Sequence, residues 1–263
     1  MKLLTLNTHS IIDNDYERRV DVFSNAIIRY KPEVIALQEV MQPSNGKEIK
    51  NDKIKVIGEA TLKKGNFLDC VIKSLEKHNI SYCGAYFTFK RAYNEYDEGL
   101  AILSNQNITS VEITQLSDFS DYSNYKTRYA LGVRTHNAWF YSLHFNWEND
   151  SDSPFEKEWK SLLEVTSQKK NVWLMGDFNL TPDSRGYELV TKSYQDTYML
   201  ATDIDNGITV SGEIDGWKGK TENKRIDYIF TSKDTEIKSS RVIFNGKNEE
   251  IISDHFGIMV EKE

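Results

Sequence analysis

The sequence predicts an α/β fold in which a mixed sheet, or two packed sheets, carries helices on the outside. Three observations support this prediction. Short apolar runs suited to buried strands recur along the chain, amphipathic stretches suited to helices lie between some of them, and other runs follow one another as in hairpins. A purely parallel sheet fits less well, because it needs a long crossover between each pair of neighbouring strands.

The predicted strands are apolar enough to be buried on both faces. They are Lys2–Leu6, Val34–Leu37, Leu100–Leu103, Ala130–Val133, Trp139–Leu143, Val172–Met175, Ile226–Phe230 and Ile237–Phe244.

Helices are predicted where apolar residues recur at the spacing of one helical face, which occurs at residues 16–30, 66–77 and 154–168. Pro32 should stop the first of them, and Pro154 suits the first turn of the third. Long polar loops are expected at residues 40–65, 116–128 and 203–224.

Length and charge narrow the classes of function. With 263 residues and no repeat or linker, the chain is predicted to form one domain over residues 1–263. The 33 Lys and Arg against 40 Asp and Glu give a net charge of −7, which disfavours nucleic acid or anionic lipid as the main partner. No signal peptide or membrane span is recognised, so a soluble cytoplasmic protein is expected, of undetermined oligomeric state.

Polar side chains stand next to the apolar runs, where rigid strands can hold them just outside the core. A single Asp or Asn there is usually a turn or cap residue, and a lone His is more often a core residue. Here, however, hard oxygen donors occur together with two histidines, a combination that favours Mg²⁺ or Mn²⁺ and metal-assisted hydrolysis. The residues are Asn7, Glu39, Glu98, His144, Asn146, Asp177, Asn179, Asp227, Asp254 and His255.

These segments resemble the endonuclease/exonuclease/phosphatase superfamily over residues 3–258. The most specific elements are Gln38-Glu39, Gly176-Asp177-Phe178-Asn179 and Ser253-Asp254-His255, which stand in the family's order. The resemblance implies a four-layer α/β sandwich, with two mixed sheets face to face and helices outside.

The resemblance also implies roles for the residues. Glu39 looks like the principal carboxylate on a divalent ion, with Asn7 and Asp254 completing its surroundings. Asp177 would orient or deprotonate the attacking water, and Asn179 would donate to a phosphate oxygen.

Two histidines resemble those of the family. His255 would contact the phosphoryl group and be oriented by Asp254 or another carboxylate. His144 resembles the second histidine, with Glu98 as its partner, and Asp227 would orient one of the two. The general base is left open between His255 and the aspartate at position 177, since the ordinary pKa of histidine permits either protonation state.

Substrate contacts are predicted from aromatic and basic residues near these segments. Trp147 and Trp217 are candidate platforms for a sugar ring, Arg128 and Arg225 are candidate phosphate clamps, and Asn146 shares a face with the second histidine. Core packing and surface charge are the alternatives for any one of them. Further aromatic residues precede Glu98 and Arg128, namely Tyr86, Phe89, Tyr93, Tyr96, Phe119, Tyr122 and Tyr125.

The N-terminal Leu-Thr-Leu-Asn-Thr-His-Ser and the segment Lys-Arg-Ile-Asp-Tyr-Ile-Phe look like the Gram-positive branch that includes maltose 6'-phosphate phosphatase. The sequence therefore predicts a Mg²⁺-dependent phosphomonoesterase of a phosphorylated sugar. The alternatives are a phosphodiesterase, such as a nuclease or sphingomyelinase-like enzyme, and a non-catalytic binding module of the same fold.

Overall fold

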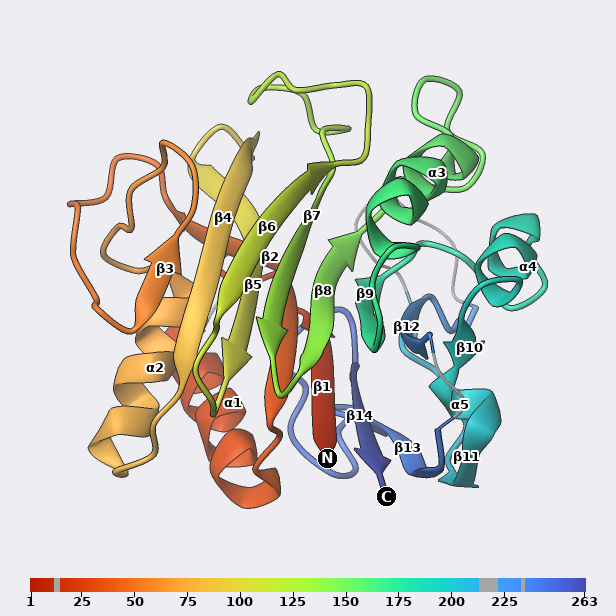
Figure 1. Ribbon diagram of the computed structural model, residues 1–263. Coiled ribbons are helices and arrows are strands. Elements are labelled where there is room, and N and C mark those ends of the chain that lie inside the picture. The colour runs from red at the N-terminus through yellow and green to blue at the C-terminus, as the bar shows by residue number, and fades with distance from the viewer. Residues whose placement is uncertain (12–14, 213–221, 233–234) are drawn as a thin grey trace.

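The computed structural model describes residues 1–11, 15–212, 222–232 and 235–263, and within them it contains two mixed sheets and five helices (Figure 1). The eight-stranded sheet has the order β11-β13-β14-β1-β2-β5-β4-β3, and the six-stranded sheet has the order β10-β12-β9-β8-β7-β6. The elements are β1 (Lys2–Asn7), α1 (Tyr16–Tyr30), β2 (Val34–Pro43), β3 (Ile54–Val56), α2 (Phe67–Lys77), β4 (Cys83–Ala92), β5 (Tyr96–Ser104), β6 (Ser110–Gln115), β7 (Tyr129–Thr135), β8 (Ala138–His144), α3 (Phe155–Thr166), β9 (Val172–Asp177), α4 (Arg185–Thr191), β10 (Gln195–Asp196), α5 (Thr197–Leu200), β11 (Ala201–Ile204), β12 (Asp227–Thr231), β13 (Ile237–Ile243) and β14 (Gly257–Lys262).

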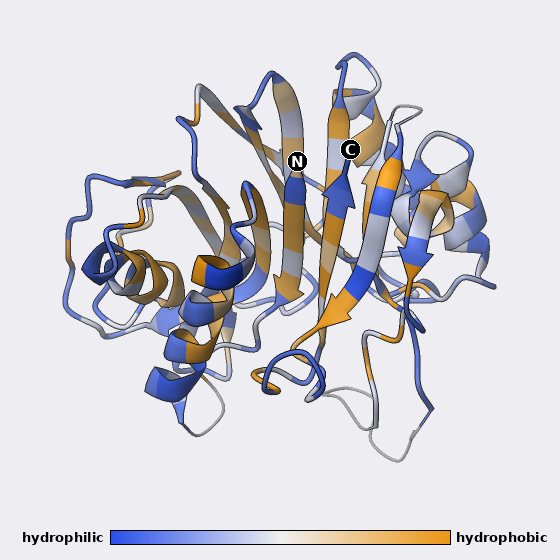
Figure 2. Ribbon diagram, turned by 90° about the horizontal axis from the view of Figure 1, so that it is seen from below, coloured by the Kyte–Doolittle hydropathy of each residue, from blue (hydrophilic) through white to orange (hydrophobic). Residues whose placement is uncertain are grey.

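Three apolar cores separate four layers. One core lies between helices α1 and α2 and the eight-stranded sheet, a second lies between the two sheets, and a third lies between the six-stranded sheet and α3. Alternation along β1 shows how the central strands serve two cores, because Leu3 faces the other sheet whereas Leu4 faces the helices. Much of the orange lies on strands and on parts of the helices, and much of the loop trace is blue or white (Figure 2). The α/β fold and the sandwich that the resemblance implied are confirmed.

The predicted helices and apolar strands are all present. Helix α1 covers residues 16–30, and its last turn is followed by Lys31 in a left-handed conformation just before Pro32. The side chain of Asn66 caps α2 by accepting a hydrogen bond from the Asp69 N–H. Helix α3 begins directly after Pro154.

Several strands were not predicted, because only apolar runs were interpreted as strands. Strand β6 is half-exposed along its length, as is common at a sheet edge, so its sequence is not an apolar run. The predicted loop at 40–65 is partly wrong, because β2 continues to Pro43 and β3 lies within it. Tyr86 and Phe89 belong to β4 and are buried in the core.

The central position of β1 brings the ends of the described chain together. Strand β1 pairs parallel with β2 and antiparallel with β14, and the Met1 ammonium donates a hydrogen bond to the Lys262 carbonyl. At the other end of β1, the Ser253 hydroxyl donates to the Asn7 carbonyl over 2.7 Å. This contact places the segment that carries Asp254 and His255 beside the end of β1.

Among the helices described, none has the length and apolar character that crossing a lipid bilayer requires.

Candidate active site

Strand register brings three of the predicted residues together at the same end of neighbouring strands in the six-stranded sheet. His144, at the end of β8, lies opposite Asp177, at the end of the parallel strand β9. Asp227, the first residue of β12, lies opposite the same Asp177 on the antiparallel side. In the facing sheet, Asn7 ends β1 beside Gln38 of β2. Segments far apart in the sequence therefore meet at one end of the sandwich.

Local backbone features aim these side chains. The pairing of β2 with β5 shifts register between Leu37 and Val40, and Glu39 within that irregularity has a left-handed backbone with φ of 50°. Asn179 is also left-handed, with φ of 52°. Gly176 has φ of 146°, and a side chain there would place its Cβ 2.0 Å from the Leu143 carbonyl oxygen. Glycine is therefore required at this position.

A cleft of about 370 Å³ opens over these residues. Its lining comes from both sheets and from the loops between them: His9, Glu39, Lys90, Arg91, Ala92, Tyr93, Glu98, Tyr125, Arg128, His144, Trp147, Asp177, Asn179, Asp254 and His255. The volume lies within the range of small-molecule sites.

Asp177 lies at the centre of the polar floor. Its Oδ2 accepts a hydrogen bond from Asn7 Nδ2 over 3.2 Å, and its Oδ1 accepts one from the Asn179 backbone N–H over 2.9 Å. His144 Nε2 lies 3.5 Å and His255 Nε2 3.8 Å from the same Oδ2. Burial raises the pKa of Asp177 to about 7, and the charge of Asp227 acts in the same direction. A carboxylate with such a pKa is suited to accepting a proton near neutral pH.

Asp227 is the carboxylate that orients His255. Its Oδ2 lies 2.9 Å from His255 Nδ1, and both side chains are buried. Asp254, the other predicted partner, lies instead near His9, with 3.8 Å between its Oδ1 and His9 Nδ1. A bonded Nδ1 fixes the imidazole ring so that Nε2 is directed toward Asp177.

The surroundings of the two histidines shift their pKa values in opposite directions. Burial disfavours the charged form of His255, but the carboxylates of Asp227 and Asp177 outweigh burial and raise the pKa of His255 well above its usual value. Burial and then the positive charges of Arg128 and Lys90 lower the pKa of His144 well below its usual value. These shifts favour the charged form of His255 and the neutral form of His144.

The predicted pairing of Glu98 with His144 is wrong. Glu98 Oε1 lies 2.9 Å from the Lys90 ammonium, whereas the carboxylates nearest to His144 are Glu39, at 3.9 Å, and Asp177. Lys90 was missed by the sequence analysis. It follows the apolar run at the end of β4, so the strand-end pattern that found the acidic residues applies to it equally.

The predicted substrate contacts have different outcomes. Arg128 and Trp147 line the cleft. Asn146 does not, because its side-chain amide donates to Glu158 Oε1 over 2.6 Å and to the Lys126 carbonyl over 2.9 Å. Trp217 lies outside the described residues.

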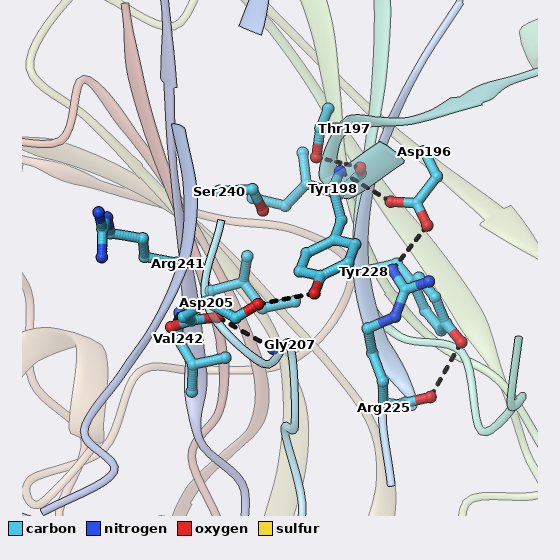
Figure 3. A pocket seen from close by; sticks show the side chains of 12 residues that line it. Asp196, Thr197, Tyr198, Asp205, Gly207, Arg225, Tyr228, Ser240, Arg241 and Val242 are labelled. Carbon is cyan, nitrogen blue, oxygen red and sulfur yellow. Dashed lines mark hydrogen bonds and ion pairs between the residues drawn. The ribbon is translucent and has the colours of Figure 1, made fainter. Parts of the chain in front are cut away.

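Arg225 is not a phosphate clamp of this cleft. It lies in a separate small cavity where its guanidinium pairs with Asp196 over 2.6 Å (Figure 3). The guanidinium carbon lies 4.7 Å from the ring centres of both Tyr198 and Tyr228. A cation that is stacked and paired in this way has a structural function.

Replacing Arg225 with glutamine should therefore lower stability without weakening substrate binding. Leaving the buried Asp196 carboxylate without its cation, with only the hydrogen bonds from Tyr187 and Tyr198, is expected to cost about 3 kcal/mol of unfolding free energy. Urea unfolding measures this loss, and the KM for a phosphoester should stay within about twofold of wild type. A large rise in KM at unchanged stability would restore the role as a phosphate clamp.

Thr209 is a residue that the sequence analysis missed entirely. It is fully buried, and its hydroxyl oxygen accepts hydrogen bonds from the backbone N–H groups of Ile226 and Asp227, over 3.1 and 3.2 Å. Its carbonyl accepts from the Phe256 N–H over 2.7 Å. One residue thus ties together the backbones that carry both members of the Asp227–His255 pair. A single threonine in a polar segment gives no sequence signal for this function.

Thr209→Val should lower kcat about tenfold with little change in KM, because it leaves two buried N–H groups without an acceptor beside Asp227. Thr209→Ser keeps the hydroxyl and should recover most of the rate. Steady-state kinetics of both variants, with thermal unfolding alongside, makes the comparison. Equal rates for the valine and serine variants would contradict a positioning function.

Two groups of potential metal ligands lie in this site, one around Asp227 and one around Glu39. Asp177, Asp227 and His255 offer donor atoms that lie within 4.8 Å of one another, although His255 can bind a metal only as the neutral imidazole, the form that its raised pKa disfavours. Asn7 Nδ2 also donates to Glu39 Oε1 over 3.0 Å, so the Glu39 carboxylate faces the Asp177 carboxylate across one amide. Burial, followed by the charges of Glu98 and Asp254, raises the pKa of Glu39. A cation would relieve this crowding of negative charge, so the donor set fits a metal ion.

Comparison with known proteins agrees with this geometry. The profile of the Endonuclease/Exonuclease/phosphatase family matches residues 4–255. An endonuclease/exonuclease/phosphatase family protein from Leptotrichia buccalis is 30% identical, with a TM-score of 0.87 and coverage of 100% of this chain and 99% of that one. The search of curated proteins gave no match.

More distant solved structures share the fold. A mannosyl-6-phosphatase from Bacteroides thetaiotaomicron is 16% identical, with a TM-score of 0.69 and coverage of 100% and 99%. A 3' phosphatase from Neisseria, bound to a product DNA hairpin, is 16% identical, with a TM-score of 0.67 and the same coverage. The match over nearly the whole chain and the convergent site lead to one conclusion: the chain belongs to the endonuclease/exonuclease/phosphatase family of metal-dependent phosphoester hydrolases.

Proposed function

We propose that the protein is a Mg²⁺-dependent phosphomonoesterase that acts on a phosphorylated sugar, with a disaccharide phosphate such as maltose 6'-phosphate as the expected substrate. The observation that carries this proposal is an aromatic rim above an acidic floor. Tyr93 and Tyr125 are 51% and 68% exposed, and with Trp147 they line the same cleft as Asp177 and His255.

Exposed aromatic rings at the mouth of a cleft are suited to sugar rings, which present C–H-rich faces for stacking. The solvent-accessible tyrosines are not needed to fill the core, since the three apolar cores exclude them. The fold shared with the mannosyl-6-phosphatase adds support, because that enzyme's name places sugar-phosphate chemistry on this architecture. The net charge of −7 further favours a small substrate over DNA.

The metal is proposed to bind through Glu39, Asn7 and Asp254. Carboxylate and amide oxygens are the ligands that Mg²⁺ prefers, and Asn7 can present its oxygen after a half turn of the amide group. When bound, Mg²⁺ supplies Lewis-acid stabilisation of the charge on the phosphoryl oxygens.

Side chains of the protein are proposed to perform the proton transfer and to hold the phosphate. Asp177 accepts the proton of the attacking water, for which its pKa of about 7 is suited. The charged His255 donates from Nε2 to a phosphoryl oxygen, while Asp227 holds its Nδ1. Asn179 uses one N–H of its amide on the Phe145 carbonyl, over 2.9 Å, which leaves the second for the phosphate. The neutral His144 lies beside Asp177 and serves as a further hydrogen-bond donor.

A panel of phosphorylated mono- and disaccharides tests the proposal by release of inorganic phosphate in the presence of Mg²⁺. Turnover of one or more sugar phosphates at kcat/KM well above that of p-nitrophenyl phosphate is expected. Nicking of plasmid DNA or cleavage of sphingomyelin without sugar-phosphate turnover would instead support a phosphodiesterase, and no hydrolysis of any ester would support a binding module.

The rim is tested with Tyr125→Ala, which removes a ring that is mostly exposed. KM for the best sugar phosphate should rise about tenfold, whereas KM for methyl phosphate, which has no sugar ring, should stay unchanged. Met199→Ala, at a residue that is 69% exposed and does not line the cleft, is the matched control.

A further inference from the structure

Arg128 is a buried cation without an acidic partner. It directly precedes β7, is 7% exposed and lines the cleft. Its Nη1 donates only to backbone carbonyls, those of Tyr125 and Thr127, over 2.7 and 3.1 Å. Its Nε is buried without a hydrogen-bond partner, and no carboxylate in the described part of the chain forms an ion pair with it.

Glu158 interacts electrostatically with Arg128 but already accepts hydrogen bonds from other groups. Its Oε1 accepts hydrogen bonds from Asn146 and Ser153, each over 2.6 Å. Its Oε2 accepts from the Asn146 backbone N–H. Burying a guanidinium in this way is unfavourable unless an anion arrives to pair with it.

Lys90 places a second cation on the same wall of the cleft. Its side chain is 8% exposed and pairs with Glu98 over 2.9 Å, and its Nζ also approaches the Tyr125 carbonyl at 3.4 Å. Burial, followed by the positive charge of Arg128, lowers the pKa of Lys90, so the two cations repel each other. Glu98 compensates one of the two charges, which leaves a surplus positive charge on this wall.

The floor of the cleft is acidic, in contrast to the wall that carries Arg128 and Lys90. Glu39, Asp177 and Asp254 line the cleft there, and a charged His255 together with a divalent ion would just balance their three negative charges, so the floor offers no surplus positive charge to a phosphate. A phosphomonoester brings two negative charges near neutral pH, because its second pKa is about 6, whereas a diester brings only one. A dianion therefore needs one more cationic partner than a monoanion, and the wall that carries Arg128 supplies one.

We propose that Arg128, supported by Lys90, is the specificity determinant that recognises the second negative charge of a terminal phosphate and so selects phosphomonoesters over phosphodiesters. Arg128 would donate through its second terminal nitrogen, because Nη1 already donates to carbonyls and Nε is enclosed, to the phosphate oxygen that carries the second ester group in a diester. An ester at that position would leave the guanidinium buried and unpaired, which disfavours diesters. The inference rests on the proposed function to the extent that the site binds a phosphoester.

Binding of two small probes to the Mg²⁺-loaded protein tests the inference without requiring turnover. Isothermal titration at pH 8 compares methyl phosphate, a dianion, with dimethyl phosphate, a monoanion. Wild type should bind methyl phosphate more tightly. Arg128→Gln should raise the Kd of methyl phosphate roughly 10- to 100-fold and leave that of dimethyl phosphate nearly unchanged, because a hydrogen bond to a charged group is lost for the dianion alone.

Three further variants make the result interpretable. Arg134→Gln removes an exposed arginine from the other end of β7 and should change neither Kd. Lys90→Arg keeps both charges and should preserve the preference. Lys90→Gln combined with Glu98→Gln removes the supporting cation without stranding a buried carboxylate, and it should weaken methyl phosphate binding less than Arg128→Gln does. Thermal unfolding of each variant confirms that it is folded.

The inference is overturned if Arg128→Gln weakens both probes equally, if it changes neither, or if folded wild type shows no preference for the dianion. These outcomes are separable from failure of the proposed function. Loss of the monoester preference in Arg128→Gln, in a protein that hydrolyses no sugar phosphate, would retain the inference and refute only the sugar.

Discussion

Replacing Asp177 with asparagine should lower kcat roughly a thousandfold while leaving the fold intact. Asparagine has nearly the same shape and can keep the hydrogen bond from the Asn179 N–H, but it cannot accept a proton from water. Loss of a positioned base costs about 10²- to 10⁴-fold in rate. Phosphate release under saturating substrate and Mg²⁺ measures the effect.

His255→Ala is the informative companion to Asp177→Asn. If Asp177 is the base and His255 the donor, each variant alone should be severely impaired, and the double variant should be little worse than either, because the two act in one step. Near wild-type turnover in Asp177→Asn would assign the general base to His255. That is the question that the sequence leaves open.

Removal of the metal should abolish turnover, and Glu39 should determine how much metal the enzyme needs. Excess EDTA is expected to reduce phosphate release to background, and Mg²⁺ added back should restore it. Glu39→Gln replaces a charged ligand with a neutral one, so the Mg²⁺ concentration for half-maximal activity should rise at least about tenfold. A Mg²⁺ titration of activity in both proteins gives this comparison.

A matched control for Glu39 is Glu48→Gln, an exposed glutamate outside the cleft. Its Mg²⁺ dependence should equal that of wild type. If Glu39→Gln titrates like wild type whereas Asp227→Asn needs more metal, the ion belongs to the group formed by Asp177, Asp227 and His255.

The parts of the fold that could be predicted are those that leave a local pattern. Strands buried on both faces read as apolar runs, and α1 reads as one apolar face. Strand β1 and helix α1 were found at nearly their observed limits, whereas β2 and β5 extend well beyond the predicted runs. Strand β6 is half-exposed at a sheet edge and leaves no apolar run, whereas β4 is mostly buried and was not predicted. The layering followed from the family resemblance, because no local pattern says which faces meet.

In the site, the sequence identifies which residues take part better than it identifies their partners. Asp177, His144 and Asp227 lie side by side because strand register places them there, and their strand-end positions were visible. Glu98 was assigned to the wrong partner because Lys90, eight residues earlier, reaches it across the β4–β5 hairpin. Arg225 precedes a catalytic strand, yet its long side chain extends to Asp196 in another cavity, a direction that sequence position does not specify.

The left-handed backbone at Glu39 lowers stability at the position whose carboxylate we propose to bind the metal. A non-glycine residue held with φ of 50° stores of order 1 kcal/mol or more, and asparagine at position 179 tolerates this conformation better than glutamate does. Glycine in place of Glu39 would relieve the strain and remove the carboxylate together. Selection for heat resistance alone would therefore favour loss of the carboxylate that we propose to bind the metal, whereas selection for turnover would retain Glu39.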